Sequence, residues 1–261
     1  MGGNIFKAMI VEETSQNIFT RKISEKSIDD LPDGDVLVRV LYSSLNYKDA
    51  LSATGNKGVT RKYPHTPGID AAGIVEQSKT KEFSEGDQVI VTSYDLGMNT
   101  SGGFGQYISV PKDWVVRLPA GLSLKESMIY GTAGFTAGLS VSNLTRTIRP
   151  DHGIILVTGA SGGVGSLAVS LLVQMGYDVA GVSGKVEERE FLAKLGVKEV
   201  LSIADAVDTS DRPLLKERWA GVVDTVGGDI LTTGIKSTKL DGVATCCGNA
   251  ASGDLPLTVY P

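Results

Sequence analysis

Residues 154–165 read IILVTGASGGVG, an apolar run followed at once by a glycine-rich loop. A short run of apolar residues is typical of a strand with both faces covered in a parallel sheet. Glycines let the backbone turn tightly and approach a pyrophosphate, and a following helix offers unpaired N–H groups and the positive end of its dipole. The stretch therefore predicts a dinucleotide-binding loop; the alternative is a tight turn that binds nothing. The expected cofactor contacts are Ser161, Gly162, Gly163 and Val164.

The residues that follow alternate between strand and helix patterns. Strands are expected at 178–182, 199–202, 221–225 and 242–246, and helices at 165–175 and 186–195. This alternation indicates right-handed βαβ units and a doubly wound sheet of five parallel strands. The carboxyl ends of such strands border the ligand crevice. Gly227 follows the fourth strand, and Gly248 and Asn249 follow the fifth, so these three residues are expected to contact the cofactor.

The end of the second strand decides which dinucleotide is expected. NAD sites usually carry an Asp or Glu there, which binds the ribose 2′-hydroxyl. Here the chain reads Ser183-Gly184-Lys185, without a carboxylate at the tip. A hydroxyl and an ammonium suit a 2′-phosphate, which an Asp would repel, so these residues predict NADP(H). Ser183 alone is also compatible with a simple strand-end cap. Glu187 and Glu188, which follow one turn later, are expected to face solvent.

The first part of the chain has a different pattern. Short strand-like stretches lie between turn residues at 7–11, 35–41, 71–76, 88–92, 104–110 and 114–117. Strands at this spacing, separated by Gly, Pro and Asp, indicate an antiparallel, barrel-like domain. The pattern changes near residue 125, and a long helix is expected over 124–144. The predicted fold is α/β, with a β-barrel domain at 1–125 and a dinucleotide-binding domain at 126–261.

Composition excludes several classes of protein. Hydrophobic residues make up 41% and charged residues 21% of the 261 residues, which fits a globular chain and excludes wholesale disorder. The net charge of −5 argues against a basic nucleic-acid-binding surface, and no run approaches the ~18 apolar residues of a membrane span. Cys246 and Cys247 are expected as buried strand thiols. Two cysteines and two histidines are too few for a cysteine-rich zinc site, and the cytoplasm is the expected location.

Four further motifs carry a family resemblance. They read NYKD at 46–49, HTPGIDAAG at 65–73, GDQV at 86–89 and GGFG at 102–105. With SGGVG at 161–165 and SGK at 183–185, they resemble the medium-chain dehydrogenase/reductase superfamily, in particular its zinc-free quinone oxidoreductase branch and the NADPH-dependent acrylyl-CoA reductase group. The resemblance implies a GroES-like catalytic domain and a Rossmann domain. The family also has a sixth strand that supports a homodimer and a segment that returns to the catalytic domain, so this chain is expected to be truncated.

The metal ligands of the zinc-dependent relatives are replaced in this sequence. Those relatives carry a Cys near the first motif and Gly-His-Glu in the second, where this chain has Asn46 and Gly68-Ile69-Asp70. An imidazole ligand is thereby exchanged for an aliphatic side chain. No metal is expected, and polarisation of an alcohol by a Lewis acid is not the expected chemistry.

Without a metal, the simplest expected reaction is hydride addition to an activated C=C bond or to a quinone. The resemblance implies that Tyr47 contacts the cofactor, and its phenol is the expected catalytic group beside the nicotinamide. Asn46 is expected either to donate to the substrate carbonyl oxygen or to fix the nicotinamide ribose, and Asp70 to orient these partners. The alternatives are a packed aromatic for Tyr47 and a carboxylate that caps local N–H groups for Asp70. The family places the helix of Thr132 beside the cofactor, although ordinary helix packing explains Thr132 equally well.

Three functions remain open on the sequence alone. The first is an NADPH-dependent reductase of enoyl thioesters such as acryloyl-CoA, in which hydride reaches the β-carbon and a proton the α-carbon. The second is an NADPH:quinone oxidoreductase, which needs an apolar slot. The third is an NADPH-binding sensor without turnover. Loops form the substrate pocket, and their sequences do not indicate which substrate binds. The sequence therefore does not determine the acceptor, the proton donor or the oligomeric state.

Overall fold

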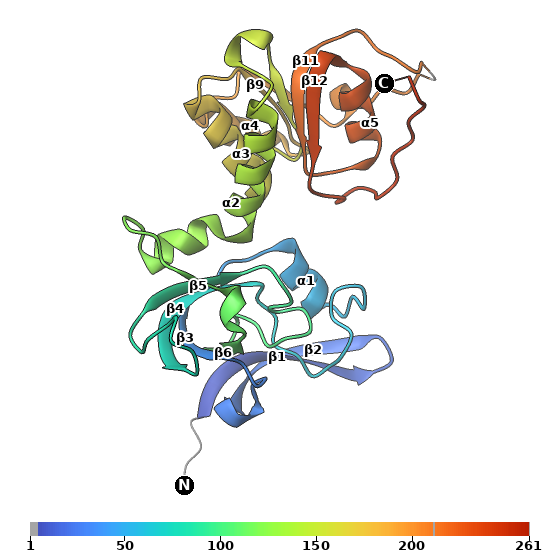
Figure 1. Ribbon diagram of the computed structural model, residues 1–261. Coiled ribbons are helices and arrows are strands. Elements are labelled where there is room, and N and C mark those ends of the chain that lie inside the picture. The colour runs from blue at the N-terminus through green and yellow to red at the C-terminus, as the bar shows by residue number, and fades with distance from the viewer. Residues whose placement is uncertain (1–4, 211, 261) are drawn as a thin grey trace. The chain divides into compact units, whose positions relative to one another are not determined.

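The computed structural model describes residues 5–210 and 212–260, apart from the side chain of Val186 (Figure 1). The chain forms two compact units, Met1–Thr132 and Ala133–Pro261. The division falls inside the long helix α2 (Leu124–Thr145), which also contains the expected boundary at 125/126. Residues 211 and 261 of the expected dinucleotide-binding domain lie outside the described residues.

The first unit is built on an antiparallel sheet of five strands in the order β6-β3-β4-β5-β7. The strands are β3 (Val36–Tyr42), β4 (Asp70–Ser78), β5 (Gln88–Thr92), β6 (Tyr107–Val110) and β7 (Val115–Arg117). Successive residues of a strand face opposite sides, so alternate side chains enter the core. The buried cluster includes Val36, Val38, Val75, Val89 and Ile108. The expected antiparallel domain is confirmed.

A hairpin of β1 (Ile5–Ser15) and β2 (Ile18–Ser27) completes the first unit. Backbone hydrogen bonds tie β1 to two loops, from Met9 to Phe104 at 2.9 Å and from Val11 to His65 at 2.8 Å. The expected strand at 7–11 lies within β1. No strand was expected at β2, because most of its side chains are exposed on both faces and leave little alternation to detect.

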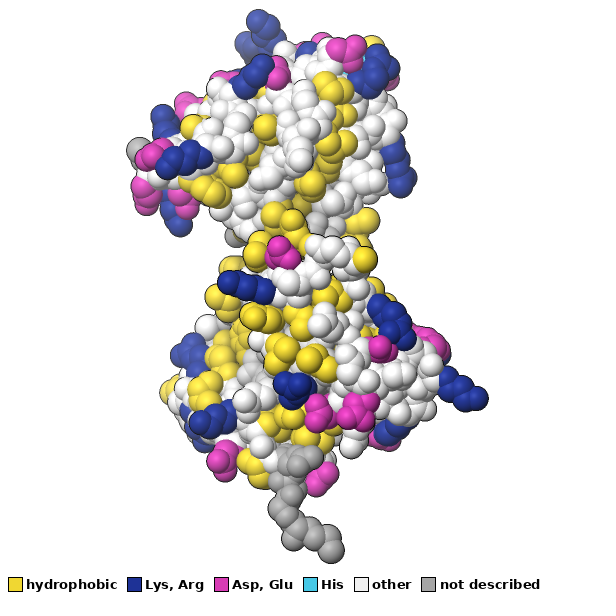
Figure 2. Space-filling model, turned by 90° about the vertical axis from the view of Figure 1, so that its left-hand side faces the viewer, with side chains coloured by type: hydrophobic (Ala, Val, Ile, Leu, Met, Phe, Trp, Pro, Cys, Tyr) yellow, Lys and Arg dark blue, Asp and Glu magenta, His cyan; other side chains and the backbone are white. Residues whose placement is uncertain are grey.

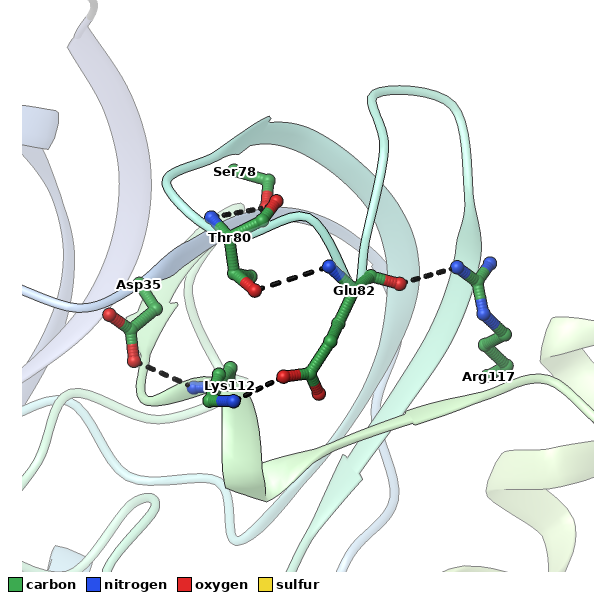
Figure 3. A network of polar contacts seen from close by, with 6 residues as sticks. All are labelled: Asp35, Ser78, Thr80, Glu82, Lys112 and Arg117. Atoms are coloured by element: carbon green, nitrogen blue, oxygen red, sulfur yellow. Dashed lines mark hydrogen bonds and ion pairs between the residues drawn. The ribbon is translucent and has the colours of Figure 1, made fainter.

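A chain of polar contacts at the surface restrains the loop between β4 and β5 (Figure 3). Lys112 forms an ion pair with Glu82 and donates its backbone N–H to the Asp35 carboxylate at 3.0 Å. Arg117 of β7 donates to the carbonyl oxygen of Glu82 at 2.5 Å. Exposed ion pairs contribute only about 0–1 kcal/mol each, so these contacts shape a loop rather than form a reactive site.

Helical structure in the first unit departs from the expectation in two places. The short helix α1 (Tyr47–Ala53) was not expected, because seven residues are too few to display a helical period. The expected long helix is interrupted at Gly131, whose backbone has φ 49° and ψ −153°. That conformation is essentially restricted to glycine. Helix α2 therefore consists of two helical segments joined by a kink.

The second unit is a parallel sheet of five strands with helices on both faces (Figure 1). The strands are β8 (Ile155–Val157), β9 (Val179–Val182), β10 (Glu199–Leu201), β11 (Trp219–Asp224) and β12 (Thr238–Cys246), and the helices include α3 (Gly163–Gln174), α4 (Arg189–Lys194) and α5 (Gly228–Lys236). Their order is β10-β9-β8-β11-β12, so β8 lies in the middle and the strand order reverses between β8 and β11. Dinucleotide-binding folds have this order, with the ligand crevice at the switch point. The expected doubly wound sheet of five parallel strands is confirmed.

Both faces of this sheet are covered, which explains the wholly apolar strands. On one face Val157 and Val179 pack with Leu172 of α3. On the other face Leu156 and Val222 belong to a separate buried cluster that lies beneath α5. Hydrophobic side chains also reach the surface of both units, among charged ones, as Figure 2 shows.

Two expectations for the second unit are wrong in detail. The helix expected over 186–195 is a 3-10 turn, η4 (Val186–Glu188), followed by the short α4. Cys246 and Cys247 are exposed rather than buried. Cys246 is the last residue of β12 and Cys247 follows it; this strand lies at the edge of the described sheet, where side chains are covered less completely than those of central strands.

Candidate functional site

A buried carboxylate organises a polar cluster in the first unit. Asp70, the first residue of β4, is 0% exposed. Its Oδ2 accepts hydrogen bonds from the Asn46 side chain and the Thr132 backbone N–H, both at 2.9 Å, and another from the Ser44 hydroxyl. Its Oδ1 accepts from the Thr132 hydroxyl at 2.6 Å. A buried charge is costly unless it is hydrogen-bonded, so these donors make the carboxylate tolerable. The cluster brings three predicted site residues together.

The side-chain amide of Asn46 has both of its N–H bonds engaged. Its Nδ2 donates to Asp70 Oδ2 and, at 3.1 Å, to Ser44 Oγ. An ionised carboxylate only accepts hydrogen bonds, so the amide nitrogen must face Asp70. The side-chain carbonyl oxygen of Asn46 is an acceptor, and in the capping box at the start of α1 it faces the Asp49 backbone N–H. The two roles expected for Asn46, donating to a substrate oxygen and holding a ribose hydroxyl, stay predictions.

A second buried carboxylate fixes the start of α1. Asp49 is 3% exposed and accepts from the backbone N–H groups of Asn46 at 2.8 Å, Gly68 at 3.2 Å and Ile69 at 2.9 Å. Burial raises the pKa of the Asp49 carboxyl above its ordinary value, against the opposing effect of these hydrogen bonds. Sequence reasoning gave Asp49 no role. Its signal was an acidic residue three positions after a helix N-cap.

Tyr47 differs from its neighbours because it lies at the surface. It is the first residue of α1 and is 69% exposed. Its ring is therefore not packed into the core, which was the alternative to a role in the reaction. Because the ring supports no other part of the unit, its hydroxyl can be removed with little effect on folding.

The glycine-rich loop of the second unit turns at Gly159 and is closed by Gly165. Gly159 has φ +56°, and a Cβ at Gly165 would lie 2.1 Å from the carbonyl oxygen of Gly159. The first turn of α3 therefore packs directly on the loop. Gly162 is the N-cap of α3, and the first N–H groups of a helix have no partner inside it. The predicted contacts Gly162, Gly163 and Val164 lie on this one turn, where the helix can receive an anion.

Beside the loop, hydrogen-bond donors gather around an anion of the chain itself. The Ser183 hydroxyl donates to Glu188 Oε2 at 2.7 Å, and Lys185 Nζ lies 3.1 Å from Glu188 Oε1. Ser161 Oγ lies 3.3 Å from Ser183 Oγ. Hydrogen bonds from Ser161 and Ser183 lower the pKa of Glu188 to about 2, so the carboxylate is ionised at neutral pH. We call Ser161, Ser183 and Lys185 the anion pocket. The expectation that Glu188 faces solvent is wrong, because its carboxylate turns back to these donors.

The opposite side of the switch point is organised by Asp224, the last residue of β11. It is 0% exposed and accepts from the Thr158 hydroxyl at 2.6 Å and the Gly227 backbone N–H at 2.8 Å. Sequence reasoning missed it, although an acidic residue at the carboxyl end of an apolar strand was a visible signal. Cys246 Sγ lies 3.4 Å from Asp224 Oδ2. Partial desolvation and this hydrogen bond raise the pKa of the Cys246 thiol, which opposes a nucleophilic role.

Three of the predicted cofactor contacts are glycines with packing roles of their own. A Cβ at Gly227 would lie 2.3 Å from a backbone oxygen, and one at Gly248 would lie 2.1 Å from another. A Cβ at Gly184 would lie 3.0 Å from the Ile203 side chain. Asn249, next to Gly248, is exposed. Packing requires glycine at 227 and 248 whatever binds there, so contact of these residues with a cofactor stays a prediction.

Among residues 5–210 and 212–260, no group of three or more His, Cys, Asp or Glu side chains is placed to hold a metal ion. In the same part of the chain, no helix combines the length and the apolar character needed to cross a bilayer.

Two protein-family models match the chain, one within each unit. The alcohol dehydrogenase GroES-like domain matches residues 32–120. The zinc-binding dehydrogenase family matches residues 163–261.

Close relatives match nearly the whole chain. AcuI of Ruegeria pomeroyi, an acrylyl-CoA reductase, is 42% identical over 98% of this chain and 78% of its own. YhfP of Bacillus subtilis, provisionally named a quinone oxidoreductase, is 45% identical over the same shares. The crystal structure of the YhdH oxidoreductase from Salmonella enterica in complex with NADP has a TM-score of 0.94 and 44% identity, covering 98% of this chain and 78% of that one. The structure of YhfP with NAD bound has a TM-score of 0.94 and 44% identity, covering 99% and 79%.

Proposed function

The chain belongs to the medium-chain dehydrogenase/reductase superfamily, in its zinc-free quinone oxidoreductase branch, and we propose that it is an NADPH-dependent reductase of activated 2-enoyl thioesters such as acryloyl-CoA. The observation that carries the proposal is the anion pocket of Ser161, Ser183 and Lys185 beside the glycine-rich loop. The acrylyl-CoA reductase relative supports the enoyl thioester as the acceptor. Bound NADPH supplies the hydride in such a reaction.

The residues of the second unit fit a dinucleotide that carries a 2′-phosphate. The anion pocket already receives a carboxylate, and carboxylate and phosphate accept hydrogen bonds from the same kinds of donor. The start of α3 offers backbone N–H groups and the positive end of the helix dipole to the pyrophosphate. Because Gly165 lets α3 pack closely on the loop, we propose that the anion pocket and the N–H groups at the start of α3 belong to one site.

In the first unit we propose different roles for three neighbouring residues. The Tyr47 hydroxyl donates to the substrate carbonyl oxygen as negative charge develops there. The Asn46 carbonyl oxygen accepts from a ribose hydroxyl of the cofactor. Asp70 is a positioning residue, because its oxygens accept from Ser44, Asn46 and Thr132 and it is wholly buried. Solvent delivers the proton to the α-carbon.

The Tyr47→Phe variant should lower kcat by about 10- to 100-fold, since a hydrogen-bond donor at the developing charge typically contributes this much or more. Stability should not change, because the side chain is 69% exposed. The measurement is kcat with acryloyl-CoA together with thermal unfolding. Tyr94→Phe is the matched control: Tyr94 is 57% exposed and donates to a surface carbonyl, so its loss should leave kcat unchanged. Equal kcat in wild type and Tyr47→Phe would contradict the proposed role.

The proposed function itself is tested by following NADPH oxidation at 340 nm with acryloyl-CoA and with 1,4-benzoquinone. We expect saturable turnover of acryloyl-CoA, with a kcat/KM higher than for the quinone. A higher kcat/KM for the quinone would favour the second candidate, an NADPH:quinone oxidoreductase, which the name of YhfP supports. Tight NADPH binding without turnover of either acceptor would exclude both enzymes and leave the sensor.

A further inference from the structure

The donors expected to receive a 2′-phosphate are occupied by the chain's own carboxylate. Glu188 accepts from the Ser183 hydroxyl at 2.7 Å and pairs with Lys185 at 3.1 Å. The Ser183 hydroxyl also accepts from the Lys185 backbone N–H at 3.2 Å, so the strand end is folded around these groups. A phosphate bound by Ser183 and Lys185 therefore has to take the place of the Glu188 carboxylate.

The geometry leaves Glu188 able to move away. It lies at the end of the 3-10 turn η4, and its side chain is 24% exposed, so rotation about its own bonds carries the carboxylate into solvent. Lys185 is more exposed still, at 67%. Hydrogen bonds from Ser161 and Ser183 lower the pKa of Glu188, so these hydroxyls favour its charged form. Displacement of the Glu188 carboxylate breaks its hydrogen bond from Ser183 and its ion pair with Lys185. An incoming anion must therefore form equivalent contacts.

From this arrangement we propose that Glu188 is a specificity-determining residue, which competes with the 2′-phosphate of NADP(H) for the anion pocket and so narrows the preference for NADP(H) over NAD(H). NAD(H) has no 2′-phosphate and binds without displacing Glu188. The turn η4 brings the Glu188 carboxylate to Ser183, next to the end of β9, and NAD sites use a carboxylate at that place to accept the ribose 2′-hydroxyl. Relatives of equal similarity were solved with NADP and with NAD, so this family of structures accommodates both. The inference rests on the proposed dinucleotide site.

The test compares the dissociation constants of NADP⁺ and NAD⁺, measured by titration calorimetry, for wild type, Glu188→Gln and Glu188→Ala. Removing the carboxylate charge that competes with the 2′-phosphate for Ser183 and Lys185 should raise the ratio of the NAD⁺ dissociation constant to the NADP⁺ dissociation constant by about five- to tenfold in both variants. Glu187→Gln is the matched control, because Glu187 is the exposed neighbour in the same turn and its loss changes the net charge equally. Its ratio should stay within twofold of wild type.

The outcomes separate this inference from the proposed function. If wild type binds NADP⁺ and the Glu188 variants keep or lower the ratio, Glu188 supports the pocket rather than competing for it, and the inference is wrong while the proposed function stands. A ratio that rises equally in Glu187→Gln would also overturn it, because net charge alone would be the cause. If wild type binds neither dinucleotide, the proposed function fails and the inference fails with it. Adenosine 2′,5′-bisphosphate against 5′-AMP gives the same comparison without the nicotinamide half.

Discussion

Replacement of Gly131 by alanine should lower the free energy of unfolding of the first unit by about 3–5 kcal/mol and remove most of the reductase activity. Gly131 has φ 49° and ψ −153°, a conformation that costs an L-residue about 1–3 kcal/mol. A Cβ there would lie 2.5 Å from Asp70 Oδ2 and 2.8 Å from Ser44 Oγ. The methyl group must therefore push a wholly buried carboxylate away from its donors, and groups left without partners cost about 1–3 kcal/mol more.

The two tryptophans allow this loss to be assigned to one unit. Trp114 lies in the first unit and Trp219 in the second, so urea unfolding followed by fluorescence in a Trp219→Phe background reports the first unit alone. Gly121→Ala is the matched control. Gly121 also has a positive φ, +88°, but nothing lies within 4 Å of its Cβ position, so its substitution should cost only about 1–2 kcal/mol of backbone strain. If Gly131→Ala lowers the free energy of unfolding by no more than Gly121→Ala, the side chains around Asp70 can move to accept a methyl group. The cluster then does not fix the kink.

The Gly165→Ala variant should destabilise the second unit by about 2–4 kcal/mol and weaken NADPH binding more than tenfold. Its Cβ would lie 2.1 Å from the Gly159 carbonyl oxygen and 2.8 Å from Ala160 Cα, both backbone atoms that have no rotamer to change. The helix must move away from the loop, and its N–H groups then leave the position in which they receive a phosphate.

Gly163→Ala separates packing from cofactor approach. A Cβ at Gly163 meets only the Ala133 side chain, at an ordinary 3.5 Å, so the free energy of unfolding should stay within about 1 kcal/mol of wild type. Its affinity for NADPH should nevertheless fall, because the proposal places this residue against the pyrophosphate. The measurements are NADPH titration and urea unfolding followed by Trp219 in a Trp114→Phe background. A Gly165→Ala variant as stable as Gly163→Ala would contradict the close packing of α3 on the loop.

The sequence predicted the features that depend on local pattern and on burial. The five parallel strands and the loop at 158–165 follow from apolar runs and glycine spacing, which are visible in short windows. The strand β2 and the helix α1 were not predicted, because β2 is mostly exposed and α1 has only seven residues, so tertiary contacts decide their structure. Propensity and periodicity are weak where packing decides.

The sequence predicted which residues belong to the candidate site, but not which of their side chains contact one another. Asn46, Asp70 and Thr132 were all expected near the reaction, yet no spacing indicated that one carboxylate would accept hydrogen bonds from both of the others. The same limit applies to Glu188. Its position one turn beyond the strand suggested a solvated helix residue, and only the fold of η4 directs it to Ser183. Contacts between residues distant in sequence depend on how the backbone is arranged in space, which a local pattern does not contain.

The carboxylate of Asp70 also has a consequence for how the first unit opens. Its donors come from the segment after β3 and from the kink in α2, which are separated from β4 by 26 and 62 positions in the chain. Detaching either segment leaves a wholly buried carboxyl without its full set of hydrogen-bond donors, so a partly open state is less stable. Local fraying at α2 is thereby linked to unfolding of the whole first unit. Through these contacts, one buried carboxyl can make the unfolding of three segments that are distant in the chain cooperative.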